Sequence, residues 1–154
     1  MLTIRTLEKI KLGSRITLFN GIYATLLGIF YLGFFNFILK TNFKAIDTVW
    51  QVFAKYNPEV NSLFIRLMLL KGAFIIAIAV LLIYLSMSLY RKKEKQTWVA
   101  LFIVGIIFWP SLLTFEILDK NLYTIIAVFL GWLSFIIGML IPAKYFIKSE
   151  PGYE

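Results

Sequence analysis

Long apolar runs without a charged residue recur four times along this chain of 154 residues. They extend over residues 16–39, 72–90, 97–115 and 121–143. A helix needs about 20 residues to cross the roughly 30 Å of hydrocarbon in a bilayer, and each run has about that length. Lipid offers no hydrogen bonds to the peptide groups, so these runs have to form helices. The pattern predicts an all-α transmembrane four-helix bundle, a single integral membrane domain of residues 1–154 with spans at about 16–40, 60–92, 97–118 and 121–144.

The segment between the first two runs is polar, but its apolar residues recur at helical spacing. Asn42 has a side chain that is favoured at helix N-caps, and it precedes this pattern. The pair Asn57 and Pro58 indicates the end of one helix and the start of the next, because Pro is favoured in a first helical turn. We therefore predict one short amphipathic interfacial helix at about 43–56. The second span would begin near Pro58 and be longer than the bilayer is thick.

Basic residues flank the runs and are divided unevenly between the two sides of the predicted bundle. The loop between the second and third spans carries the densest group, Arg91, Lys92, Lys93 and Lys95. Cytoplasmic loops are enriched in Lys and Arg, so this group predicts that both termini are cytoplasmic, N-in and C-in. Trp50 and Trp98 lie at the outer and cytoplasmic boundaries, where aromatic side chains anchor membrane proteins at the interface. The basic residues flank spans rather than alternate with aromatics, so we expect no nucleic acid partner.

Composition supports a membrane protein and removes several kinds of chemistry. Hydrophobic residues make up 60% of the chain, against about 45–50% in soluble domains. The chain contains no Cys and no His, the residues that supply thiolate and imidazole ligands and the commonest general base. We therefore expect no cofactor, no metal and no enzymatic activity. The frequent Ile, Lys, Phe and Asn are typical of an AT-rich genome, which favours the plasma membrane of a prokaryote.

Small and polar residues inside the spans indicate how the helices pack. Lipid tails are as apolar as Leu, so close contact at small residues and hydrogen bonds between helices hold a membrane bundle together. Pairs of small residues that share a helix face are Ala24 and Gly28, Ala73 and Ala77, and Gly131 and Gly138. We expect these pairs to pack within the chain rather than between copies. Polar side chains placed to bond across helices are Asn20, Tyr23 and Tyr31.

Pro110 lies in the middle of the third span. It has no N–H to donate and its ring clashes with the preceding turn, so it predicts a kink. Many membrane helices kink without any function depending on the kink. The alternative is that this one opens a cavity between helices.

Lys71 is the charged residue that most requires an explanation, since a Lys at the membrane centre costs about 2.5–3.5 kcal/mol on insertion scales. It either extends its side chain to the outer headgroups or pairs with Glu116, which is at a similar depth in the third span. In the second case Asn36 and the indole of Trp109 are expected to complete an outward-facing polar pocket around the pair.

Two functions fit these features. The lack of catalytic residues, the aromatic spans and the small soluble part favour a non-catalytic accessory, assembly or scaffold component of a membrane complex. Its partners would be the lipid bilayer and either other membrane subunits or further copies of itself. The alternative is a binder or transporter of a small solute or lipid, using the pocket around Lys71 and Glu116. A lipid-modifying enzyme with Glu116 or Asp119 as acid or base has the least support.

Overall fold

The computed structural model describes residues 4–44 and 50–147, and this part of the chain is helical with no strand. Its long helices are α1 (Ile4–Gly33), α4 (Pro58–Lys92), α5 (Lys95–Leu118) and α6 (Leu122–Ile147). Its short helices are α2 (Phe35–Lys44) and α3 (Trp50–Tyr56). Among the described residues, four helices are long and apolar enough to cross a bilayer, as predicted. The protein is therefore a multi-pass membrane protein whose apolar outer faces contact lipid.

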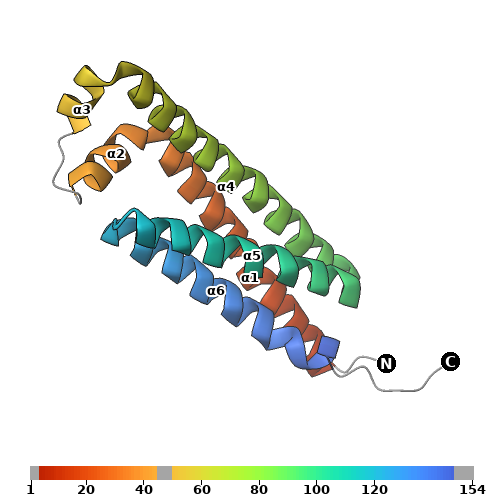
Figure 1. The fold of residues 1–154 in the computed structure, drawn as a ribbon. Helices are drawn as coiled ribbons and strands as arrows, with labels where there is room; N and C mark the ends of the chain where they lie inside the picture. Colours follow the sequence, from red (N-terminus) through yellow and green to blue (C-terminus); the bar gives the residue numbers. More distant parts are fainter. Residues whose placement is uncertain (1–3, 45–49, 148–154) are drawn as a thin grey trace.

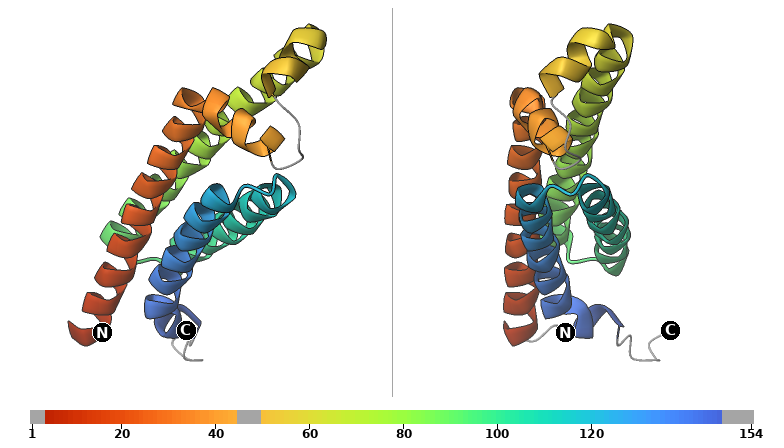
Figure 2. Two further views of the ribbon diagram at one scale, coloured as in Figure 1. Left: turned by 90° about the vertical axis from the view of Figure 1, so that its left-hand side faces the viewer. Right: turned by 60° about the vertical axis from the view of Figure 1, so that its left-hand side comes forward.

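The four long helices alternate in direction and form a closed ring (Figures 1 and 2). α1 packs against α4 and α6, and α5 contacts both α6 and α4, with α4 and α5 the most loosely packed of these pairs. The start of α1, the turn from α4 to α5 and the end of α6 lie at one end, which we call the terminal end. The turn from α5 to α6 lies with α2 and α3 towards the other end, the hairpin end.

The first membrane helix differs from the predicted span of 16–40. α1 begins at Ile4, and its first turns are amphipathic, with Ile10 buried and both Lys9 and Lys11 exposed. Such a pattern lets a helix continue out of the hydrocarbon into the headgroup region. The helix ends at Gly33, where the chain bends into α2 (Figure 1). Gly is about 1 kcal/mol less favourable than Ala in a helix, which makes it a natural point for a bend within an apolar run.

The single amphipathic helix predicted at about 43–56 lies partly outside the described residues and stays a prediction. α2 extends to Lys44, α3 begins at Trp50, and positions 45–49 are not described. Asn42, which we expected to cap that helix, is in the last turn of α2, and its Oδ1 accepts a hydrogen bond from Asn121. The same side chain suits a local cap or a distant partner, so the local pattern alone could not distinguish them.

Trp50 and Trp98 are buried instead of facing the headgroups as interfacial anchors. The ring of Trp50 lies edge-on to Phe43 of α2 at 4.7 Å between centroids, and 6.3 Å from Phe64 of α4. Trp98 stacks on Phe146 at 5.5 Å, which joins α5 to α6 at the terminal end. Both indoles therefore hold helices to one another, one at each end of the molecule.

The interface between α1 and α4 uses small residues, although not all of those predicted. A Cβ on Gly28 would lie 3.1 Å from the carbonyl oxygen of Gly72, and a Cβ on Gly72 would lie 3.2 Å from that of Gly28. Ala24 is fully buried, as expected for its pairing with Gly28. The prediction for α4 was wrong, because Ala73 and Ala77 are exposed. One helical position corresponds to about 100° of rotation, so Gly72 and its neighbour Ala73 point in different directions.

Pro110 lies inside α5, which is one continuous helix on both sides of it. The hydroxyl of Thr114 donates a hydrogen bond of 2.9 Å to the Pro110 carbonyl. A side-chain hydroxyl bonded in this way supplements the hydrogen bonding of the last turns of a Pro-containing helix. The kink that we expect at this position stays a prediction.

Candidate functional site

Lys71 and Glu116 form an ion pair between α4 and α5 near the hairpin end. Lys71 Nζ lies 2.6 Å from Glu116 Oε1. The Glu116 side chain is only 1% exposed, and that of Lys71 is 20% exposed. The predicted pairing is therefore present, and it explains how both charges are tolerated at this depth. Each charge compensates the burial of the other.

A second carboxylate shares the same ammonium group. Lys71 Nζ also donates to Asp119 Oδ2 at 3.4 Å, and Asp119 lies just past the end of α5 with 36% of its side chain exposed. Burial raises the pKa of the Asp119 carboxyl above its ordinary value, although the nearby Lys71 charge acts in the opposite direction. When all three groups are ionised, one positive and two negative charges leave a net charge of −1.

Two aromatic rings also lie near the Lys71 ammonium. Its Nζ lies 5.0 Å from the ring centroid of Tyr31 in α1 and 5.9 Å from that of Phe115 in α5. The negative face of an aromatic ring attracts a cation within about 6 Å. Sequence reasoning placed Tyr31 among residues that bond across helices, but its position beside Lys71 depends on how α1 and α4 align. We call Lys71, Glu116, Asp119 and Tyr31 the hairpin-end cluster.

Two residues expected in this pocket are elsewhere. Asn36 lies on α2 and is exposed. Trp109 is fully buried, and its Nε1 donates a hydrogen bond of 3.1 Å to Asn20 Oδ1. Along α5, Trp109 lies about 10 Å deeper than Glu116, at 1.5 Å per residue. The prediction for Trp109 was wrong because a shared helix face gives a common direction but does not determine which neighbouring helix each residue meets.

Trp109 belongs to a separate polar network that joins α1, α5 and α6 in the middle of the bundle. Asn20 Nδ2 donates to the carbonyl of Gly131 and to the hydroxyl of Ser134, both at 2.7 Å. The Tyr23 hydroxyl donates to a carbonyl of α6 at 2.8 Å, and its ring stacks on Trp109 with 6.3 Å between centroids. These bonds confirm the prediction that Asn20 and Tyr23 bond across helices. Because its polar groups bond to one another, the network serves packing.

An apolar groove of about 620 Å³ opens between α4 and α5 beside the hairpin-end cluster. Sites for small molecules commonly measure about 300–1,000 Å³ and are mostly apolar with a few polar groups. Lys71 and Asp119 line the groove near the hairpin end, and Ser111 contributes a hydroxyl further along α5. The apolar lining residues are Phe64, Leu67, Met68, Leu70, Phe74, Ile75, Ile78, Ile107, Phe108, Leu112 and Phe115.

The groove extends along α4 from Phe64 to Ile78, a distance of about 21 Å at 1.5 Å per residue. One leaflet contributes about 15 Å of hydrocarbon, half of the roughly 30 Å core. The groove is therefore as long as the acyl layer of one leaflet with some of the adjoining headgroup region. Asp119 lies at the hairpin end of the α5 wall, whereas Lys71 lies midway along the α4 wall, between Phe64 and Ile78.

Glycine positions explain why the groove forms between this pair of helices. A Cβ on Gly105 would meet the ring of Phe135, which shows close packing of α5 on α6. Gly28 and Gly72 allow close packing of α1 on α4, and Gly138 allows it between α6 and Thr17 of α1. Among the glycines that the structure describes, none faces the neighbouring helix across the contact of α4 with α5. Larger side chains make this contact, among them Lys71 and Glu116.

No family model, no curated protein and no solved structure matches this chain. The chemistry of the site is therefore inferred from the chain's own residues.

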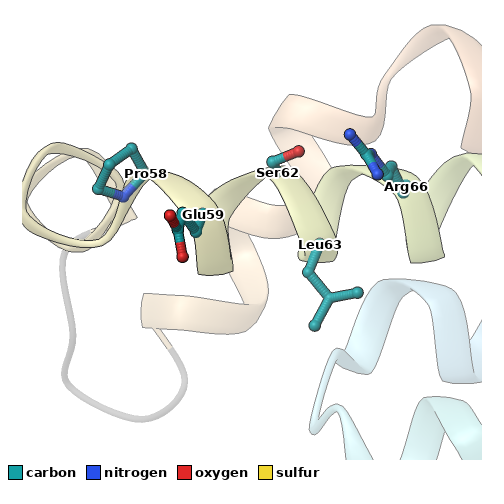
Figure 3. Close-up of a pocket in the computed structure, with 5 residues that line it drawn as sticks. All are labelled: Pro58, Glu59, Ser62, Leu63 and Arg66. Atoms are coloured by element: carbon teal, nitrogen blue, oxygen red, sulfur yellow. The ribbon is translucent and has the colours of Figure 1, made fainter.

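A second hollow, of about 430 Å³, lies along the first turns of α4 and is lined by Pro58, Glu59, Ser62, Leu63 and Arg66 (Figure 3). Ser62 and Arg66 point to one side of the helix and Leu63 points to the other. All five residues belong to α4, so no second element supplies an opposite wall. A ligand there would be held from one side only, and we assign this hollow no role.

Proposed function

We propose that this membrane protein is a non-catalytic binder of an amphiphilic molecule, which it takes into the groove between α4 and α5 from the surrounding leaflet. The observation that supports the proposal is the position of charged groups beside a long apolar groove. The charges of Asp119 and Lys71 lie on the groove wall, and from Asp119 a mostly apolar lining continues along α5 to Ile107, about 18 Å at 1.5 Å per residue. An amphiphile has the same order of parts, a long apolar tail followed by a polar head.

The polar end of the groove supplies most of the selectivity under this proposal. Lipid tails and the groove walls are equally apolar, so moving a tail from lipid into the groove gains little beyond better packing. Electrostatic contacts at the head are stronger, because a site beside hydrocarbon has a lower effective dielectric constant than water. The hairpin-end cluster is therefore expected to decide which molecules remain bound.

Filling the groove is expected to release its ligand. Ser111 lines the groove and is exposed, so Ser111→Trp places an indole where a tail would lie. We expect this variant to retain at most about a tenth of the lipid bound by the wild type, which corresponds to about 1.4 kcal/mol. The measurement is native mass spectrometry of protein purified in mild detergent. Ile103→Trp is the control, because Ile103 is exposed on α5 outside the groove. Equal lipid retention by the two variants would contradict the proposal.

An accessory or assembly role is a second candidate, supported by the length of α4. Its 35 residues extend over about 52 Å, and α3 with the start of α4 projects beyond the turn from α5 to α6 (Figure 2). Leu63 and Leu67 are exposed in this first part of α4, where another membrane subunit would find an apolar surface. A stoichiometric protein partner retained in mild detergent would favour this role over lipid binding.

We further propose that the terminal end faces the cytoplasm of a prokaryotic cell. The support is the positive-inside bias, because Arg91, Lys92 and Lys95 are exposed at the turn from α4 to α5. The chain has no Cys, so single-cysteine variants report position without background. A membrane-impermeant maleimide is expected to label Tyr56→Cys in intact cells but Glu94→Cys only after permeabilisation. The reverse pattern would contradict this orientation.

A further inference from the structure

The charges at the mouth of the groove are unequal in accessibility. Glu116 is enclosed and holds Lys71 at 2.6 Å, whereas Asp119 is partly exposed and has the longer contact of 3.4 Å with the same ammonium. Lys71 therefore pairs mainly with Glu116. Asp119 is the carboxylate that remains available to a molecule in the groove.

The basic residues nearby do not cancel the negative charge of this cluster. Among the described residues that line the groove, Lys71 is the only basic one. Arg66 lines the other hollow on α4, and Lys120 is exposed at the turn but is not part of the groove lining. With Lys71, Glu116 and Asp119 ionised, the cluster therefore has a net charge of −1 and complements a cationic group rather than an anionic one.

We propose that the occupant of the groove is a membrane lipid with a primary ammonium head, such as a phosphatidylethanolamine. This inference rests on the proposed function and names the ligand class of that site. The ammonium donates charge-assisted hydrogen bonds to Asp119, which are roughly twice as strong as neutral ones. The tail lies along the groove towards Ile78 and Ile107. Lys71 also lines the groove, and its ammonium carries three N–H donors, so it is placed to donate to a lipid phosphate or ester oxygen as well.

This site distinguishes the common headgroups by chemistry. A choline head carries the same positive charge but has no N–H, so it cannot donate a hydrogen bond to Asp119. A glycerol head leaves the lipid with a net negative charge, and the net negative charge of the cluster repels it. The lining from Asp119 to Ile107 on α5 is about 18 Å long against a leaflet of about 15 Å, which favours a lipid of the bilayer over a short free amine.

The experiment compares three lipids with identical acyl chains. The protein is reconstituted in nanodiscs that contain equal parts of phosphatidylethanolamine, phosphatidylcholine and phosphatidylglycerol, and the lipid that stays bound is counted by native mass spectrometry. We expect the ethanolamine lipid to exceed each of the others by about tenfold after correction for its share of the bilayer. Asp119→Asn is expected to reduce this preference to within about twofold, while Asp119→Glu keeps it. Glu59→Gln is the control, because Glu59 is exposed on α4 outside the groove. Thermal unfolding of each variant confirms that it is folded.

The outcomes separate this inference from the proposed function. If all three lipids stay bound equally and Ser111→Trp releases them, the headgroup inference is wrong while the groove remains a lipid site. A preference for phosphatidylglycerol would also overturn the inference, because Lys71 would then dominate the groove mouth. Retention of added dodecylamine without retention of the ethanolamine lipid would show that the ligand is a free amine. If no lipid stays bound, the proposed function fails with the inference.

Discussion

Replacing Lys71 with Met is expected to lower the free energy of unfolding by about 3–5 kcal/mol, the usual cost of removing one partner of a buried ion pair. The reason is that Glu116 has a side chain only 1% exposed and relies on Lys71 for compensation. Asp119 cannot take that role, since it carries the same negative charge. The measurement is unfolding in mixed micelles with increasing sodium dodecyl sulfate.

A double variant tests the cause of this loss. Lys71→Met combined with Glu116→Leu replaces both charges with apolar groups, a change that is commonly neutral or stabilising at buried pairs. We therefore expect the double variant to be more stable than Lys71→Met alone. Arg66→Met is the matched control on the same helix, because Arg66 is exposed, and its effect should stay within about 0.5 kcal/mol. If Lys71→Met is as mild as Arg66→Met, the ion pair does not hold α4 to α5.

Replacing Gly105 with Ala is expected to destabilise the bundle by about 1–3 kcal/mol, as overpacking of a close-packed core does. The added methyl group would overlap the ring of Phe135, which is fully buried. Ala is a better helix former than Gly by about 1 kcal/mol, and this gain opposes the clash without removing it. The net effect is measured by the same unfolding titration.

Gly33→Ala is the control for this variant, because a Cβ on Gly33 would meet nothing within 4 Å. It should be neutral or slightly stabilising. Adding Phe135→Leu to Gly105→Ala supplies room for the methyl group, so the two changes should couple by at least about 0.5 kcal/mol. Equal effects of Gly105→Ala and Gly33→Ala would show that α5 does not depend on close contact with α6 there.

Several features followed directly from the order of residues. The four spans and the long second helix depend on the length of apolar runs and on the cost of unsatisfied peptide groups in lipid, which are local properties. The pairing of Lys71 with Glu116 was also predictable, since two opposite charges at similar depth have few other ways to be compensated. Asn20 and Tyr23 likewise required partners on other helices.

Other features depended on how the helices are rotated and aligned against each other. A change of one residue along a helix rotates a side chain by about 100° and moves it by about 1.5 Å, so apolar periodicity leaves several alignments open. Contacts between distant segments select one alignment, which places Gly72 rather than Ala73 against α1 and the indole of Trp109 against Asn20. The groove arises in the same way, because close glycine contacts join the other helix pairs and leave α4 and α5 apart.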